Sequence, residues 1–274
     1  MNCQRAVMAW VGAVALLAGC AAAPSATPEL QGLLPTPLLL LGEQHDAPEQ
    51  QALQRATVRQ LAQQGQLVAV VLEMVEQGRQ TTGLPSEASE AKVREALDWR
   101  EASNSGAWDW AVYGPVVMAA VRAGVPVLGG NLPRAQMRAA MADVALDASV
   151  PPDTLQRQRD AIRDGHCGLL PETQIAPMTR IQLARDRAMA QTATGAMRPG
   201  LTVLLIAGNG HVQRDIGVPR HLDPGQSHRV VLSVARAEAA SSDPEMRLTA
   251  DRLWVTPPRP PKDHCADLKK QTGR

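Results

Sequence analysis

The amino-acid sequence predicts an α/β fold in which a mainly parallel β-sheet is flanked by helices. Short apolar segments alternate along the chain with longer segments whose apolar residues recur at helical spacing. Strands that are joined through helices form crossover connections, and these produce a mainly parallel sheet. The chain has 274 residues, of which 45% are hydrophobic and 20% charged, a composition typical of a globular protein with one large domain.

Six segments are predicted to be strands because they are short and apolar. The first ends at Gly42, and the second is rich in valine, which is typical of a strand buried on both faces. The predicted strands are residues 37–41, 67–74, 125–128, 201–207, 229–235 and 252–256.

Between these strands, apolar residues repeat at the spacing of a helix. Leu53, Val58 and Leu61 show this pattern, and Gly65 suits the position after the end of their helix. The predicted helices are residues 48–64, 87–99, 115–123, 134–146, 153–163 and 172–194. Residues 134–195 contain no strand, so we expect a helical insertion over the sheet edge.

The first residues have the pattern of an export signal. One positive charge, Arg5, precedes an apolar run that is long enough for a cleaved signal peptide and too short to span a membrane. The run ends in Leu-Ala-Gly-Cys, which resembles a bacterial lipobox, so we expect a signal peptide at residues 1–19 and lipidation of Cys20. The alternative is an ordinary signal peptide cut near Ala23, with Cys20 discarded.

The expected mature protein is a lipid-anchored protein of the bacterial outer membrane. Acyl chains on Cys20 would hold it on the membrane surface, and Ala21 in place of an aspartate favours outer-membrane sorting. Residues 20–35 would form a lipidated tether. Removal of residues 1–19 takes away one charge, leaving 27 basic and 27 acidic side chains. This balance, with no Phe and one Tyr, argues against nucleic-acid binding.

Two cysteines remain in the expected mature domain after Cys3 leaves with the signal and Cys20 takes lipid. In an oxidising periplasm, a Cys167–Cys265 disulfide is the simpler expectation. The alternative is that Cys167 is a thiolate metal ligand beside His166.

Polar residues follow four predicted strands at or near their carboxyl ends. In an open parallel sheet, ligands bind outside the carboxyl ends of the strands. These ends carry Glu43, His45, Glu73, Asn131, Asn209 and His211. Imidazoles with carboxylates suit Zn, Mn or Fe(II), so we predict a shared functional site at this edge.

Each of these residues also has a structural explanation. A histidine after a strand is often a helix cap, a buried glutamate often pairs with arginine, and an asparagine often forms a turn. Tyr113 is expected to pack at the start of a helix. Trp108 and Trp110 are expected to be core anchors, with the lining of an apolar haem-binding face as the alternative. Recurrence at four strand ends favours the functional interpretation of the site.

Two Gly-x-x-His motifs, at residues 42–45 and 208–211, each follow an apolar strand, with the acidic Glu73 between them. This ordered set resembles the ChaN/Tiki superfamily, which includes haem-binding uptake lipoproteins, Tiki-type metalloproteases and erythromycin-esterase-like enzymes. The resemblance is closest to ChaN-like haem-binding lipoproteins and spans residues 36–265, leaving 266–274 as a C-terminal tail. The stretches that carry it are Leu41-Gly42-Glu43-Gln44-His45-Asp46, Val71-Leu72-Glu73-Met74, residues 110–115, Gly130-Asn131-Leu132, His166-Cys167-Gly168, residues 207–212 and residues 215–219.

The resemblance implies a haem-binding outer-membrane lipoprotein of haem or iron uptake. It also implies a stacked pair of haems in a homodimer and an outer-membrane haem receptor as partner. A tyrosine is associated with the haem iron in ChaN-like proteins, but no motif carries that role to Tyr113. The candidate haem-binding residues are therefore His45, His211, Glu43, Glu73, Asn131, Asn209, His166 and Tyr113.

The alternative is a metal-dependent hydrolase of the Tiki or esterase type. His45 and His211, with Glu43 or Glu73, would hold a divalent metal ion that activates water, and the spare carboxylate would be the general base. Asn131 or Asn209 would then stabilise an oxyanion. A haem binder should give a ligand-induced Soret band, whereas a hydrolase should show turnover that chelators abolish.

Overall fold

The computed structural model describes residues 30–99, 108–236, 248–258 and 263–272. The predicted signal peptide and the lipidation site at Cys20 lie outside these residues. Much of the expected C-terminal tail forms helix α10 (His264–Thr272). In the part of the chain that is described, no helix combines the length and the apolar character needed to cross a bilayer.

The predicted α/β fold is confirmed, and every strand pair in its six-stranded sheet is parallel. The strand order is β3-β2-β4-β1-β5-β6. The strands are β1 (Leu38–Glu43), β2 (Leu67–Glu76), β3 (Val127–Asn131), β4 (Thr202–Gly208), β5 (Arg229–Ala235) and β6 (Arg252–Thr256). The central strands β1 and β4 are buried along their whole length, as their uninterrupted apolar sequences predict.

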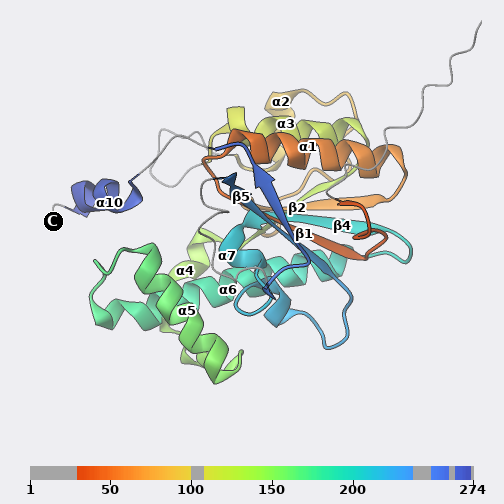
Figure 1. The fold of residues 1–274 in the computed structure, drawn as a ribbon. Helices are drawn as coiled ribbons and strands as arrows, with labels where there is room; N and C mark the ends of the chain where they lie inside the picture. The colour runs from red at the N-terminus through yellow and green to blue at the C-terminus, as the bar shows by residue number, and fades with distance from the viewer. Residues whose placement is uncertain (1–29, 100–107, 237–247, 259–262, 273–274) are drawn as a thin grey trace, which may run out of the picture.

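Helices cover both faces of the sheet (Figure 1). One face carries α1 (Pro48–Gln63), α2 (Glu90–Ala96) and α3 (Trp110–Arg122). The other carries α4 (Arg134–Ala142), η2 (Val144–Ala148), α5 (Pro152–Gly165), α6 (Glu172–Ala196), α7 (Asn209–Val212) and η3 (Val218–His221). The chain crosses the sheet in one direction from β1 to β3 and in the other from β3 to β5. Because crossovers are right-handed, this reversal moves the connections to the opposite face.

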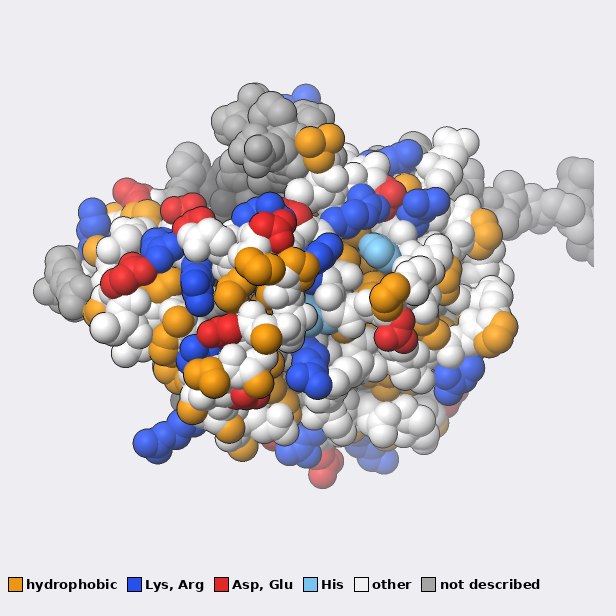
Figure 2. All heavy atoms as spheres, turned by 90° about the horizontal axis from the view of Figure 1, so that it is seen from below, with side chains coloured by type: hydrophobic (Ala, Val, Ile, Leu, Met, Phe, Trp, Pro, Cys, Tyr) orange, Lys and Arg blue, Asp and Glu red, His pale blue; other side chains and the backbone are white. Residues whose placement is uncertain are grey.

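The two faces bury separate hydrophobic clusters. Leu39 and Leu41 of β1 pack in the cluster under α1 and α3, whereas Leu38 and Leu40 pack on the side of α6. This alternation follows from the two-residue period of a strand. On the α6 side, basic, acidic and apolar side chains are interspersed at the surface (Figure 2).

The expected helical insertion at residues 134–195 consists of α4, η2, α5 and α6. Its long helix α6 packs against β2, β3 and β4, so it is itself the crossover helix on this face of the sheet. The shorter elements α4 and α5 pack against α6 and add a small third cluster that includes Leu146 and Leu183.

Helix α3 begins earlier than its sequence predicts. The expected start is Pro115, but the helix begins at Trp110, because the Asp109 carboxylate accepts a hydrogen bond of 2.9 Å from the Ala111 backbone N–H. Pro115 lies inside the helix. The earlier start places Tyr113 within α3, where its ring is buried.

Candidate functional site

Both Gly-x-x-His motifs leave the sheet side by side. Strands β1 and β4 are neighbours, and their register pairs Glu43 with Gly208. Because the strands are parallel, residues 42–45 and 208–211 emerge at the same carboxyl edge. The predicted convergence of the two motifs is therefore a consequence of strand order.

The glycine of each motif makes room for the other motif. A Cβ atom on Gly208 would lie 2.9 Å from His45 Nε2, and a Cβ atom on Gly42 would overlap the side chains of Asn209 and Val212. Glycine is needed at both positions because another chain segment approaches closely, and not because the backbone is left-handed. The two motifs thus form one interlocked unit.

The Glu43 carboxylate holds His45 through a dense hydrogen-bond network. Glu43 is 2% exposed, and its Oε1 lies 2.7 Å from His45 Nδ1 and accepts a 2.5 Å hydrogen bond from the Tyr113 hydroxyl. Its Oε2 accepts hydrogen bonds from Gln51 (3.0 Å) and Gln54 (2.5 Å). Both carboxylate oxygens are therefore occupied, and Glu43 orients the imidazole.

A second carboxylate orients the second histidine. Asp186 on α6 is fully buried, and its Oδ1 lies 2.6 Å from His211 Nδ1. Gln158 on α5 donates hydrogen bonds to Asp186 (3.3 Å) and to the Ile216 carbonyl (2.7 Å). Each histidine therefore has its Nδ1 fixed by a buried acid.

Glu73 lies between the two imidazoles. Its Oε1 is 3.5 Å from His211 Nε2, and its Oε2 is 3.9 Å from His45 Nε2. The Gly208 backbone N–H donates a 2.7 Å hydrogen bond to the same Oε2. The free nitrogens of both rings thus face one buried carboxylate.

This packing shifts the ionisation of the site. Burial alone would raise the pKa of Glu73, but the positive charges of His211 and His45 and the Gly208 N–H lower it. Burial alone would lower the pKa of His211, but the charges of Glu73 and Asp186 raise it. Burial likewise opposes a charged His45, but its hydrogen bond to Glu43 and the charge of Glu73 outweigh burial and raise its pKa. Both imidazoles therefore keep a proton to a higher pH than an ordinary histidine, and Glu73 stays ionised to a lower pH than an ordinary glutamate.

Tyr113 is held in its neutral form. Burial raises the pKa of its hydroxyl, and the charge of Glu43 raises it further. The hydroxyl also lies 3.2 Å from His45 Nδ1. Tyr113 thus supports the pair of Glu43 and His45, as a buried residue that donates to the carboxylate.

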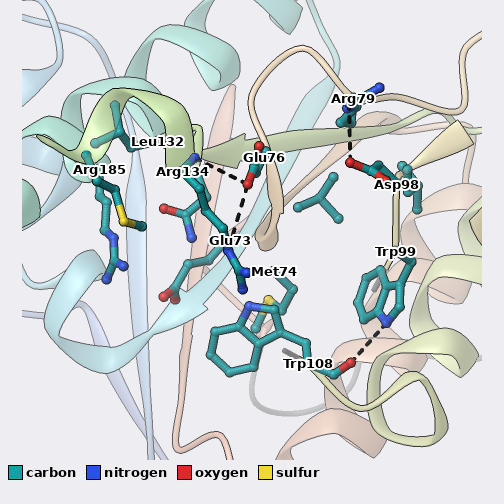
Figure 3. Close-up of a pocket in the computed structure, with 14 residues that line it drawn as sticks. Glu73, Met74, Glu76, Arg79, Asp98, Trp99, Trp108, Leu132, Arg134 and Arg185 are labelled. Atoms are coloured by element: carbon teal, nitrogen blue, oxygen red, sulfur yellow. Dashed lines mark hydrogen bonds and ion pairs between the residues drawn. The ribbon is translucent and has the colours of Figure 1, made fainter. Parts of the chain in front are cut away.

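A cavity of about 250 Å³ opens beside Glu73 (Figure 3). Apolar side chains form part of its wall, among them Met74, Trp108 and Leu132. The Trp108 ring also contacts His45, with ring centroids 4.6 Å apart. Asn131 lines the cavity, and its buried Oδ1 has no hydrogen-bond partner in the described part of the chain. The cavity is thus lined by polar side chains, among them Glu73 and Asn131, and by apolar side chains.

The other candidates have structural contacts. Asn209 exchanges hydrogen bonds with the Ser233 backbone, with its Nδ2 2.7 Å from the carbonyl and its Oδ1 3.2 Å from the N–H, so it ties its motif to β5. His166 lies at the end of α5, with Nδ1 2.8 Å from the Ile162 carbonyl. Cys167 and Cys265 are joined by a disulfide, which removes Cys167 as a thiolate.

The expected metal ligands Glu43, His45, Glu73 and His211 are thus neighbours. Even so, among the described residues no group of three or more histidine, cysteine or acidic side chains is arranged to hold a metal ion. The engagement of both Glu43 oxygens with hydrogen-bond donors is part of the physical reason.

Three important residues are absent from the set that the sequence predicts. Gln51 and Gln54 lie on the buried side of α1, and Asp186 on that of α6. A signal for Asp186 exists, because it is the charged member of a row of buried residues at helical spacing. That row is Thr179, Leu183, Asp186, Ala190 and Ala193.

Comparisons with known proteins identify the family and the fold of the chain. A model of the family described as haem-binding uptake, Tiki superfamily, ChaN matches residues 30–222. No curated protein matches the chain. The solved structure of cofacial haem binding to ChaN of Campylobacter jejuni has a TM-score of 0.59 at 24% identity, covering 73% of this chain and 82% of that chain.

Two further solved structures are less similar. The type III effector HopBA1 has a TM-score of 0.43 at 12% identity, covering 81% of this chain and 88% of that chain. A Bacillus cereus protein has a TM-score of 0.34 at 14% identity, covering 72% of this chain and 65% of that chain.

The ChaN structure shows the same fold, and the family model spans well over half of the chain, which confirms the resemblance inferred from the paired motifs. The chain belongs to the haem-binding uptake family of ChaN proteins in the Tiki superfamily.

Proposed function

We propose that this protein binds haem at the carboxyl edge of the sheet, as a component of haem or iron uptake. The observation that carries the proposal is the convergence of His45 Nε2 and His211 Nε2 on Glu73, beside a partly apolar cavity. Imidazole nitrogens are common haem-iron ligands. The His45 side chain is 38% exposed and that of His211 is 12% exposed, so His45 is the favoured ligand.

The residues present fit part of a haem group. Trp108, Met74 and Leu132 offer apolar contacts for a porphyrin face. The cavity is smaller than the roughly 300–1,000 Å³ of pockets that enclose a drug-sized ligand, so one face of the haem would lie outside it. A second haem on a second copy of the chain would cover that face, in the cofacial manner described for Campylobacter jejuni ChaN.

Tyr113 is a poor candidate for the iron ligand in this arrangement. It is 2% exposed, and its hydroxyl donates to Glu43. Its raised pKa disfavours the tyrosinate that would bind ferric iron. We therefore expect a Tyr113→Phe variant to retain saturable haemin binding.

Haemin titration of the lipid-free chain, carrying Cys20→Ser, tests the proposal. We expect a saturable Soret shift at a fixed ratio, which the His45→Ala/His211→Ala double variant loses or alters. His228→Ala is the matched control, because His228 is half-buried and its Nδ1 contacts the Gln226 carbonyl. Loose, unsaturable haemin binding by all three proteins would contradict the proposal. A saturable Soret shift that the double variant leaves unchanged would show that haem binds at another face of the protein.

Haemin affinity should also depend on pH. The pKa values of His45 and His211 are both raised, so both rings keep a proton at pH values where an ordinary histidine is neutral. A protonated nitrogen cannot bind iron, so affinity is expected to rise from about pH 6 to about pH 9. The same titration with His211→Ala should show a weaker pH dependence. If haemin affinity changes equally with pH in the parent and in His211→Ala, protonation of His211 does not control binding.

A Gly208→Ala substitution should weaken haemin binding with little loss of stability. The new Cβ would press on His45 Nε2, and the ring can move only by leaving its position beside Glu73. We expect an affinity loss of about tenfold, as for altered support of a metal ligand. Gly210→Ala is the control, because a Cβ atom added there would have no neighbour within 4 Å. Unchanged affinity in Gly208→Ala would show that the position of His45 is unimportant.

The same proposal includes the membrane anchor. Cys20 would carry the lipid that holds the protein on the bacterial outer membrane, and an outer-membrane haem receptor is the proposed partner. Expression of Cys20→Ser should move the protein from the membrane fraction to the soluble periplasmic fraction. Continued membrane association would contradict the anchor.

A metal-dependent hydrolase is the second candidate. It is favoured by the two histidines whose Nδ1 atoms contact buried carboxylates and whose Nε2 atoms face a shared acid, a pattern typical of metal-binding histidines. To hold an ion, His45, His211 and Glu73 would have to rearrange from the positions described, and the bound ion would then acidify a water molecule. Peptidase or esterase turnover that chelators abolish and Zn, Mn or Fe restores would support this candidate over haem uptake.

A further inference from the structure

One arginine that lines the cavity has no hydrogen-bond partner among the described residues. Arg185 lies on α6 next to Asp186 and lines the cavity wall. Its Nε is buried without a hydrogen-bond partner, and within the described residues its side chain forms no ion pair within 4 Å. By contrast, Arg79 contacts Asp98 at 3.3 Å, and Arg134 lies 4.0 Å from Glu76.

The two acids whose ionised form is favoured by the charge of Arg185, Glu73 and Asp186, already have other partners. Glu73 receives the Gly208 N–H and faces both imidazoles, so the guanidinium of Arg185 adds positive charge near Glu73 without a hydrogen bond to it. In Figure 3, the side chains of Arg185 and Arg134 point toward the side of the cavity where the Glu73 carboxylate lies. A long cationic side chain with unused donors is thus held at the edge of the site.

We propose that Arg185 recognises a carboxylate of the bound ligand, which for haem is a propionate. This inference rests on the proposed haem-binding function. A guanidinium presents its N–H groups in a planar fork that matches a carboxylate, and such charge-assisted hydrogen bonds are strong in a partly buried site. Arg185 is unpaired in the described structure, so it can bind the ligand without breaking a protein ion pair.

The three parts of the site then match three parts of one molecule. Trp108 and Met74 would contact the apolar ring, His45, which packs against Trp108, would hold the iron, and Arg185 would bind the carboxylate. A planar metalloporphyrin with a free carboxylate would use all three. The cavity should therefore distinguish haemin from the same porphyrin with both carboxylates esterified.

The test compares haemin with iron protoporphyrin dimethyl ester on the full mature chain carrying Cys20→Ser. We expect the unsubstituted site to prefer haemin by about tenfold or more, as expected for one hydrogen bond to a charged group. Arg185→Met should bind both compounds with similar affinity, and Arg185→Lys should keep part of the preference. Arg187→Met is the matched control, because Arg187 is exposed on the same helix and lines a different hollow.

Three outcomes would overturn the inference. Equal affinity of the unsubstituted site for both compounds would show that no carboxylate is recognised. If Arg185→Met and Arg185→Lys each lose the same amount of affinity for haemin and for the ester, Arg185 only supports the fold. If neither compound binds saturably to the unsubstituted site, the haem-binding proposal itself fails, and this inference fails with it.

Discussion

Replacing Glu43 with alanine should lower the free energy of unfolding by about 3–5 kcal/mol, because a buried ion-pair network would lose its central acceptor. Tyr113, Gln51 and Gln54 donate to this carboxylate, and His45 Nδ1 contacts it. Without it, these polar groups would be left at a site that is almost closed to water, and unsatisfied buried donors are costly. Urea unfolding followed by circular dichroism would measure the change.

A Glu43→Gln variant is the control for this prediction. Its amide keeps the size of the side chain and one acceptor oxygen, so the loss should be smaller than for alanine. A Glu43→Ala protein as stable as the parent would show that the network contributes nothing net to folding. An unfolded Glu43→Gln protein would show that the negative charge, and not the hydrogen bonding, is essential.

Gly129→Ala is the second substitution with a large expected effect. A Cβ atom at this position would overlap the backbone carbonyl of Glu76 on the neighbouring strand β2. The two strands are close at the irregularity in their register between Leu72 and Glu76, so the backbone itself would have to move. We expect the free energy of unfolding to fall by about 3 kcal/mol, which is at the upper end of the range for overpacked cores. A shift in the urea midpoint would measure this change.

Gly195→Ala provides the opposite expectation at an exposed helical position. Gly195 lies near the end of α6, where an added Cβ atom would have no neighbour within 4 Å, so alanine should be neutral or stabilise the helix by up to about 1 kcal/mol. Equal stability of Gly129→Ala and Gly195→Ala would mean that β2 and β3 can separate at no cost.

Local patterns in the sequence are sufficient to predict much of the fold. The apolar strands, and the histidines and acids near their carboxyl ends, follow from periodicity and from the behaviour of parallel sheets. The start of α3 is harder to predict, because Pro115 is a strong local signal for a helix start. In the structure the Asp109 cap determines the start, and the helix continues through the proline.

The contacts that orient the histidines depend on packing between distant segments. Asp186 meets His211 only because α6 crosses back over the sheet, and Gln54 meets Glu43 only because α1 lies over the end of β1. No local pattern specifies such contacts. The helical spacing marks Asp186 as buried, but it does not identify its partner.

The reciprocal fit of Gly42 and Gly208 has a consequence for evolution. A side chain gained at Gly208 displaces His45, and one gained at Gly42 displaces Asn209. A mutation in one motif therefore changes which residues the other motif can tolerate. Homologues that differ in one motif should also differ in the other. A homologue that keeps only one Gly-x-x-His motif should have lost the site altogether, and should not be assigned its function.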